Sequence, residues 1–238
     1  MVISVFMGLW LGAPLSGLSD TTLILPGGGS VNGRLVKPYR ARTITYRLVD
    51  GREEQIGTVE DQYSWITIDG IERGLRVARI VLPGREILDS GLVDASSLKP
   101  FYHHSHQRDR TMLLTFGERA VTGTTWTAAK TDTVAIGLPY AIFDSYFEDF
   151  IARSITLKDG LQFSFPDFIL EAGGLVYQSG KVRRLATEGP AGRWTVSYTD
   201  SKTGRETTYT LDDQRRILDR VYRINGKTTM SRPEFGRS

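Results

Sequence analysis

The sequence contains no cysteine. This absence excludes disulfides, thiol catalysis and cysteine-based zinc sites, and it excludes the lipid-bearing cysteine of a bacterial lipoprotein. Histidine is almost as scarce, since the 3 histidines of the chain are His103, His104 and His106. Any histidine base or metal ligand must therefore come from one short segment.

Long runs of like-charged residues and of apolar residues are also missing. Lys and Arg total 30 against 27 Asp and Glu, and because the two signs are interspersed the net charge is only +3. Without a basic stripe, nucleic acid is not an expected partner. No segment reaches the ~18 apolar residues of a membrane-spanning helix. With 40% hydrophobic and 24% charged residues, the chain suits a globular domain with a sizeable core.

Residues 1–19 carry no charged side chain. The apolar stretch Val2–Leu11 has the length of a signal-peptide core, and Gly17 and Ser19 are small residues at the −3 and −1 positions of a cleavage before Asp20. No Lys or Arg precedes this stretch, so an apolar strand or helix packed on the domain is the alternative. The leader predicts a periplasmic or secreted protein.

The rest of the chain divides into three further parts. Residues 20–39 include the glycine-rich stretch 26–34 and are expected to form a flexible linker. Residues 40–230 are expected to form a single β-rich domain, and residues 231–238 a disordered tail.

Hydrophobicity with a period of two dominates this domain, as in strands with one buried face. It appears in residues 43–48, 111–116 and 194–199. The side chains predicted to be buried are Ile44, Tyr46 and Leu48 in the first run, Met112, Leu114 and Phe116 in the second, and Trp194, Val196 and Tyr198 in the third.

Short turn signals separate these runs, several of them Asp-Gly or Asn-Gly pairs that favour tight hairpins. They are Asp50-Gly51, Asp69-Gly70, Pro83-Gly84, Asp159-Gly160, Thr203-Gly204 and Asn225-Gly226. Roughly ten to thirteen strands in an antiparallel meander are expected.

One segment has helical spacing instead. Residues 140–153, just after Pro139, place apolar side chains three and four positions apart, with acidic residues mostly on the other side, which predicts an amphipathic helix. A phenylalanine-rich strand follows at 161–165. The fold class expected is mainly β: a strongly curved antiparallel sheet, a half-barrel or barrel-like meander, with this helix on or in its concave face.

The chemical motifs argue against an enzyme. His104 and His106 would share one face of a strand, but a metal site would need a third ligand such as Asp61 or Asp109. No G-x-S-x-G elbow is present, and the triple glycine at 27–29 lacks the Lys-Ser/Thr of a phosphate-binding loop. We therefore predict no catalytic residue, no metal and no cofactor.

Several short motifs carry a family resemblance. They are Asp94-Ala95-Ser96-Ser97-Leu98-Lys99-Pro100, Phe143-Asp144, Leu157-Lys158-Asp159-Gly160, Gly189-Pro190-Ala191-Gly192 and the stretch from Leu211-Asp212 to Ile217-Leu218. In these motifs residues 40–230 resemble an uncharacterised family of bacterial periplasmic β-proteins, a domain of unknown function. The layout is more distantly similar to the half-barrel of the Lol lipoprotein carriers. The resemblance implies that fold and a periplasmic setting, and no catalytic residue. The single clear helix here, where those carriers have several, argues against lipoprotein carriage as such.

The leading hypothesis is a non-enzymatic periplasmic protein that binds a lipid-like or other apolar small molecule in a cavity of the curved sheet. The residues expected to line it are Phe143, Phe147, Phe150, Phe163 and Phe165. The alternatives are an envelope scaffold or protein-interaction module without a ligand, whose protein partner the sequence does not identify, and a metal-dependent enzyme using the His103–His106 segment.

Overall fold

The computed structural model describes residues 21–186 and 192–234. Sixteen strands form one sheet in this part of the chain. They are β1 (Thr22–Leu23), β2 (Tyr39–Val49), β3 (Arg52–Ile68), β4 (Ile71–Leu82), β5 (Arg85–Asp94), β6 (Pro100–Gln107), β7 (Arg110–Phe116), β8 (Ala120–Thr127), β9 (Thr131–Gly137), β10 (Phe143–Asp144), β11 (Gln162–Ile169), β12 (Gly174–Leu185), β13 (Arg193–Asp200), β14 (Glu206–Asp212), β15 (Ile217–Ile224) and β16 (Lys227–Pro233). The helices are the 3-10 turns η1 (Gly33–Leu35), η2 (Ser145–Phe147) and η3 (Leu170–Ala172), and the α-helix α1 (Glu148–Ser154).

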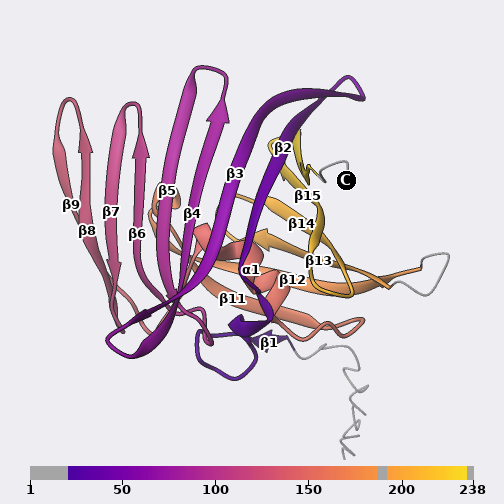
Figure 1. The fold of residues 1–238 in the computed structure, drawn as a ribbon, viewed down its shortest axis with the longest axis horizontal. Helices are drawn as coiled ribbons and strands as arrows, with labels where there is room; N and C mark the ends of the chain where they lie inside the picture. Colours follow the sequence, from indigo (N-terminus) through magenta and orange to yellow (C-terminus); the bar gives the residue numbers. More distant parts are fainter. Residues whose placement is uncertain (1–20, 187–191, 235–238) are drawn as a thin grey trace, which may run out of the picture.

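The sheet consists of two antiparallel meanders, β2 to β9 and β11 to β16. They join where the last strand, β16, pairs with β2, an arrangement we call the seam. The sheet does not close, because its two ends are β1, which pairs in parallel with β11, and β9. Figure 1 shows the two meanders curving around α1, which lies between them. The predicted fold class, a mainly β curved sheet with a helix in its concave face, is confirmed.

The predicted number of strands was too low. The short strands β1 and β10, two residues each, have no alternation to detect. The turn signals located the hairpins better: Asp50-Gly51, Asp69-Gly70 and Asn225-Gly226 all have positive φ at both positions. This backbone matches the twist of the strands that each pair connects.

Two of the three alternating runs bury the predicted face. Met112, Leu114 and Phe116 are 1–6% exposed, whereas Leu113 between them is 42% exposed. Val196 and Tyr198 are also buried, and Trp194 is half-buried. The prediction for residues 43–48 was wrong, because Thr45 is buried and Leu48 is 41% exposed. On β2 the inner face is polar: the Thr45 hydroxyl lies 3.2 Å from that of Ser231 across the seam.

The predicted helix at 140–153 is shorter and more deeply buried than expected. The Asp144 side chain accepts a hydrogen bond from the Tyr146 backbone N–H at 3.2 Å, so helical structure begins only after it, with η2 and then α1. All residues of α1 are buried, including its acidic ones. The acidic side of the helix therefore faces protein rather than water.

The predicted linker and tail boundaries also need correction. In residues 21–39, Ile24, Val31 and Val36 are buried in the core. Backbone hydrogen bonds tie this segment to the end of α1, at 3.1 Å from the Asn32 N–H to the Ser154 oxygen. The expected flexible linker is thus packed structure. At the other end β16 runs to Pro233, within the expected tail. The predicted leader, 1–19, lies outside the described residues.

Two hydrophobic clusters fill the concave side. The larger one surrounds α1 and joins β11–β14 to the inner face of β3 and β5. The smaller one lies between β7–β9 and Phe168 on β11. No helix in the described ranges is long and apolar enough to cross a membrane.

Candidate functional site

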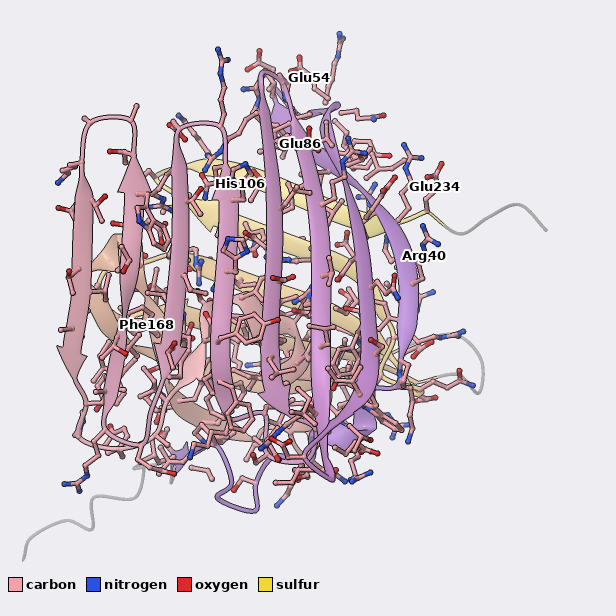
Figure 2. All side chains as sticks on the ribbon, turned by 60° about the vertical axis from the view of Figure 1, so that its left-hand side comes forward. Arg40, Glu54, Glu86, His106, Phe168 and Glu234 are labelled. Carbon is pink, nitrogen blue, oxygen red and sulfur yellow. The ribbon has the colours of Figure 1, made fainter. Side chains whose placement is uncertain are left out.

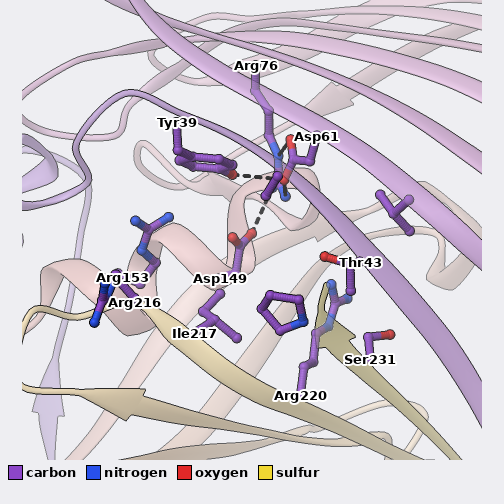
Figure 3. A pocket seen from close by; sticks show the side chains of 13 residues that line it. Tyr39, Thr43, Asp61, Arg76, Asp149, Arg153, Arg216, Ile217, Arg220 and Ser231 are labelled. Carbon is purple, nitrogen blue, oxygen red and sulfur yellow. Dashed lines mark hydrogen bonds and ion pairs between the residues drawn. The ribbon is translucent and has the colours of Figure 1, made fainter. Parts of the chain in front are cut away.

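A cavity of about 240 Å³ lies on the inner side of the seam and is lined by residues from β2, β3, β4, β15, β16 and α1 (Figure 3). Alternation along β2 turns every second side chain inward, and at this place the inward residues of β2 and β16 include the small Ala41, Thr43 and Ser231. Small side chains leave space that large ones would fill. We call this space the seam cavity.

The lining of the seam cavity combines an apolar wall with buried charges. The apolar or aromatic side chains are Tyr39, Ala41, Val59, Ile217 and Pro233. The charged side chains are Asp61, Arg76, Asp149, Arg153, Arg216 and Arg220. Such a surface accepts an apolar group and offers polar contacts to orient it.

Arg76, from β4, organises the charges at the inner wall. Its Nε and Nη2 donate to the two carboxylate oxygens of Asp61 at 3.0 and 2.6 Å, and its Nη1 donates to Asp149 at 2.7 Å and to the Tyr146 carbonyl at 2.6 Å. The Tyr39 hydroxyl donates to Asp61 at 2.8 Å. We call Arg76, Asp61, Asp149 and Tyr39 the Arg76 cluster. Its dashed contacts are visible in Figure 3.

Pairing favours the charged forms of Asp61 and Arg76. Burial alone would raise the pKa of Asp61, but the Arg76 guanidinium holds it below its ordinary value. Burial would likewise lower the pKa of Arg76, but Asp149 and Asp61 raise it well above its ordinary value. Burial raises the pKa of the Tyr39 hydroxyl, so the ring stays a neutral donor. The cluster is a set of paired charges and offers no free general base.

A family model matches residues 38–230, and its description is a protein of unknown function (DUF3108). The chain belongs to this family. The predicted membership of an uncharacterised β family is therefore confirmed. No curated protein matches the chain.

Among solved structures, the chain is similar to a beta-barrel-like protein of domain of unknown function DUF1849 from Brucella abortus. The TM-score is 0.53 at 10% sequence identity, and the match covers 86% of this chain and 97% of that one. At this identity the likeness concerns the fold alone. The more distant similarity to the Lol carriers stays a prediction.

The phenylalanines predicted to line a ligand cavity lie beside the seam cavity rather than in its lining. Phe143, Phe147, Phe150, Phe163 and Phe165 are all 0–1% exposed. They pack in edge-on and stacked pairs, such as Phe147 against Phe150 with ring centres 5.3 Å apart. Phe150 comes nearest to the lining, because its ring contacts that of Tyr39 at 6.3 Å. Direct contact of these rings with a ligand stays a prediction.

Sequence reasoning missed the residues that do line the seam cavity. Tyr39 and Ala41 precede or begin the expected domain, and Ser231 and Pro233 fall in the expected tail. The one available signal was the pair Asp149 and Arg153, which the helical repeat places on one side of α1. A charged helix side is usually solvated, and the sequence contains nothing that says otherwise.

A second buried polar group lies on the other side of α1. Gln178 donates to Glu148 at 3.2 Å and to Asp167 at 3.4 Å, and Arg205 forms an ion pair with Glu148. We call these four residues the Glu148 cluster. Burial, with the neighbouring carboxylates of Glu148 and Asp144, raises the pKa of Asp167 well above its ordinary value. Burial also raises the pKa of Glu148, against the attraction of Arg205.

The three histidines occupy different environments. His103 is buried, 3.2 Å from the Asp144 carboxylate and stacked on Tyr146 with ring centres 4.7 Å apart. Burial alone would lower the pKa of His103, but Asp144 raises it above its ordinary value. His106 is exposed on β6 (Figure 2), where its Nδ1 lies 2.9 Å from the Thr111 hydroxyl. Within the described residues no group of three or more His, Asp or Glu side chains is arranged to hold a metal.

Proposed function

We propose that this protein is a non-enzymatic, exported protein of the cell envelope that binds a lipid-like ligand in the seam cavity. The observation that carries the proposal is an apolar-walled space on the inner side of a strongly curved sheet, bordered by a fully buried helix. Ligand sites are commonly apolar concavities with a few placed polar groups.

The size of the seam cavity favours a small or single-chain ligand. At about 240 Å³ it lies slightly below the range of roughly 300–1,000 Å³ typical of small-molecule sites. One acyl chain, or part of one, suits this space better than a multi-chain lipid. Phe150 supports the wall from behind through its contact with Tyr39.

One further observation supports a binding rather than a catalytic role, and a second supports export from the cytoplasm. Asp61 and Asp149, the carboxylates in the lining, are both held by Arg76, so neither is available as a base. The uncharged leader, residues 1–19, supports export to the periplasm or beyond. The Arg76 cluster then acts as the rigid inner wall of the binding site.

Filling the cavity tests the proposal. Ala41→Trp places a large ring in the lining, whereas Arg40→Trp puts the same ring on the neighbouring exposed position of β2 (Figure 2). Each protein is purified from the envelope of its own host and examined by native mass spectrometry and by lipid extraction. We expect a bound apolar molecule with the wild type and Arg40→Trp, and its loss in Ala41→Trp.

Two results would contradict the proposal. One is a wild-type protein that carries no extractable molecule and binds none of a series of fatty acids and alcohols. The other is a ligand that Ala41→Trp retains while its thermal unfolding remains that of the wild type. The intact mass of the same sample also checks cleavage before Asp20.

A further inference from the structure

The seam cavity carries positive charge that the protein itself does not neutralise. Its lining holds four arginines against two aspartates. Both aspartates, Asp61 and Asp149, are paired with Arg76. Arg216 is paired with Asp212 at 2.7 Å and its side chain is 64% exposed, so its charge is largely solvated. Arg153 and Arg220 remain.

Arg220, from β15, is the more exceptional of the two. Its Nε is buried and has no hydrogen-bond partner in the part of the chain described. The guanidinium is stacked on the rings of Tyr222, at 4.0 Å, and Tyr209, at 5.5 Å. Aromatic stacking holds the plane of the group in place while leaving its N–H edge available. In Figure 3 the Arg220 side chain extends toward the middle of the lining residues.

Arg153 contributes a second fixed cation. It lies in the last turn of α1, and its side chain is nearly buried. Its Nε donates to the Arg215 carbonyl at 3.1 Å, and its guanidinium lies over the rings of Tyr39, at 5.1 Å, and Phe150, at 5.8 Å. None of the ion pairs between described residues includes Arg153 or Arg220.

One buried carboxylate that feels this charge is already paired with another cation. Glu148 feels the charge of Arg220, which works against the rise in its pKa. Its carboxylate, however, forms an ion pair with Arg205 and accepts a hydrogen bond from Gln178, in the Glu148 cluster. The buried Nε–H of Arg220 without an acceptor is costly unless a partner of opposite charge arrives. The partner that fits must bring an anionic group into an apolar space.

We propose that the ligand of the seam cavity is an anionic amphiphile, whose carboxylate or phosphate head binds Arg220 and Arg153 while its chain lies against Ala41, Val59 and Ile217. This inference rests on the proposed function and adds the chemical class of the ligand. Arginine suits the role because its planar fork donates two parallel hydrogen bonds to a carboxylate or phosphate. A neutral amphiphile of equal length gains the apolar contacts alone.

Calorimetric titration with matched probes tests the head group. Decanoate, decyl phosphate, decanol and inorganic phosphate are each titrated into the wild type, Arg220→Gln and Arg223→Gln. Arg223 is the matched control, because it lies on the same strand and is exposed outside the lining. Whichever of decanoate and decyl phosphate binds more tightly identifies the head as carboxylate or phosphate.

We expect at least one anionic probe to bind the wild type more tightly than decanol. Arg220→Gln should weaken this anionic probe by about 10- to 100-fold, because a hydrogen bond to a charged group is lost. Its affinity for decanol should change by less than about twofold, and Arg223→Gln should match the wild type for every probe. Arg153→Gln, in the same titration, replaces Arg220→Gln if that variant does not fold.

The outcomes separate this inference from the proposed function. Equal binding of decanol and both anionic amphiphiles, unchanged in Arg220→Gln, overturns the anionic head and leaves the lipid-binding function standing. Failure of every amphiphile to bind overturns both. If inorganic phosphate binds but none of the amphiphiles does, the inference is also overturned, because the cavity then binds an anion but not an acyl chain.

Discussion

Asp149 and Glu148, neighbours on α1, belong to two buried charged clusters that are built differently. Asp149 belongs to the Arg76 cluster, in which one arginine serves two carboxylates and a tyrosine hydroxyl donates to one of them. Glu148 belongs to the Glu148 cluster, in which a half-buried arginine meets two fully buried acids. The first cluster keeps its charges by pairing them. In the second, burial and the nearby carboxylates of Glu148 and Asp144 raise the pKa of Asp167 well above its ordinary value.

The difference predicts opposite responses to pH. Because the folded pKa of Asp61 is lowered, its contribution to stability is present above the unfolded value of about 3.9 and is lost as pH falls through the folded pKa. Because the folded pKa of Asp167 is raised, its contribution is greatest below that unfolded value and is lost as pH rises toward the folded pKa. As pH rises, the stability contributed by Asp61 therefore increases while that contributed by Asp167 decreases.

The largest loss of stability is expected from removing the cation of the Arg76 cluster. Arg76→Met leaves Asp61 and Asp149 buried without a partner, so we expect the free energy of unfolding at neutral pH to fall by about 3–5 kcal/mol. Urea denaturation followed by circular dichroism measures it. Arg79→Met is the matched control on the same strand, since its pair with Glu86 is about half exposed on both sides, and should cost less than about 1 kcal/mol. Equal losses in the two variants would contradict this prediction, because the buried ion pairs of Arg76 would then stabilise the fold no more than the exposed pair of Arg79 and Glu86.

A smaller effect is expected from the matching change in the Glu148 cluster. Arg205→Met removes the cation, but Glu148 can take up a proton in its place, so the loss at neutral pH should be about 1.5–3 kcal/mol. The same reason predicts that the loss shrinks as the pH is lowered toward about 5. Urea midpoints of wild type and variant across this pH range measure the difference. A loss that is independent of pH would contradict protonation of the cluster.

The smallest expected effect is a change in how steeply the free energy of unfolding depends on pH. Asp167→Asn keeps the shape of the side chain and cannot ionise, so the variant should lack the loss of stability that Asp167 brings as pH rises above about 4. The gain relative to wild type should grow by at most about 1.4 kcal/mol per pH unit. Urea midpoints at several pH values give the slope. Asp159→Asn, at an exposed turn residue, should follow the wild type.

The fold was largely predictable because its signals are local. The alternation at residues 111–116 and 194–199 and the Asp-Gly and Asn-Gly turns each depend on a few neighbouring residues, and they led to the correct curved antiparallel sheet. The alternation at 43–48 misled, because Thr45 faces inward to a polar partner, Ser231. No pattern within β2 reveals that partner.

The candidate site was much less predictable, and α1 shows why. A helix with phenylalanines on one side and acids on the other has the pattern of a helix at the surface. Here the acidic side is buried because Arg76, on β4, and Arg205, just before β14, pair with it. The five phenylalanines predicted to line a cavity, around this helix and on the strand after it, are all buried, and their contact with a ligand stays a prediction.

By itself the sequence determined most of the longer strands, most of the hairpins and the family, since these follow from side-chain period, turn backbone and short motifs. Only the tertiary structure decided that the chain's first long strand pairs with its last, joining residues such as Thr45 and Ser231 that are 186 positions apart. The seam cavity exists because of that pairing, and so do the neighbours of Arg153 and Arg220. Contacts at such separation depend on how the whole sheet curves, which no local pattern specifies.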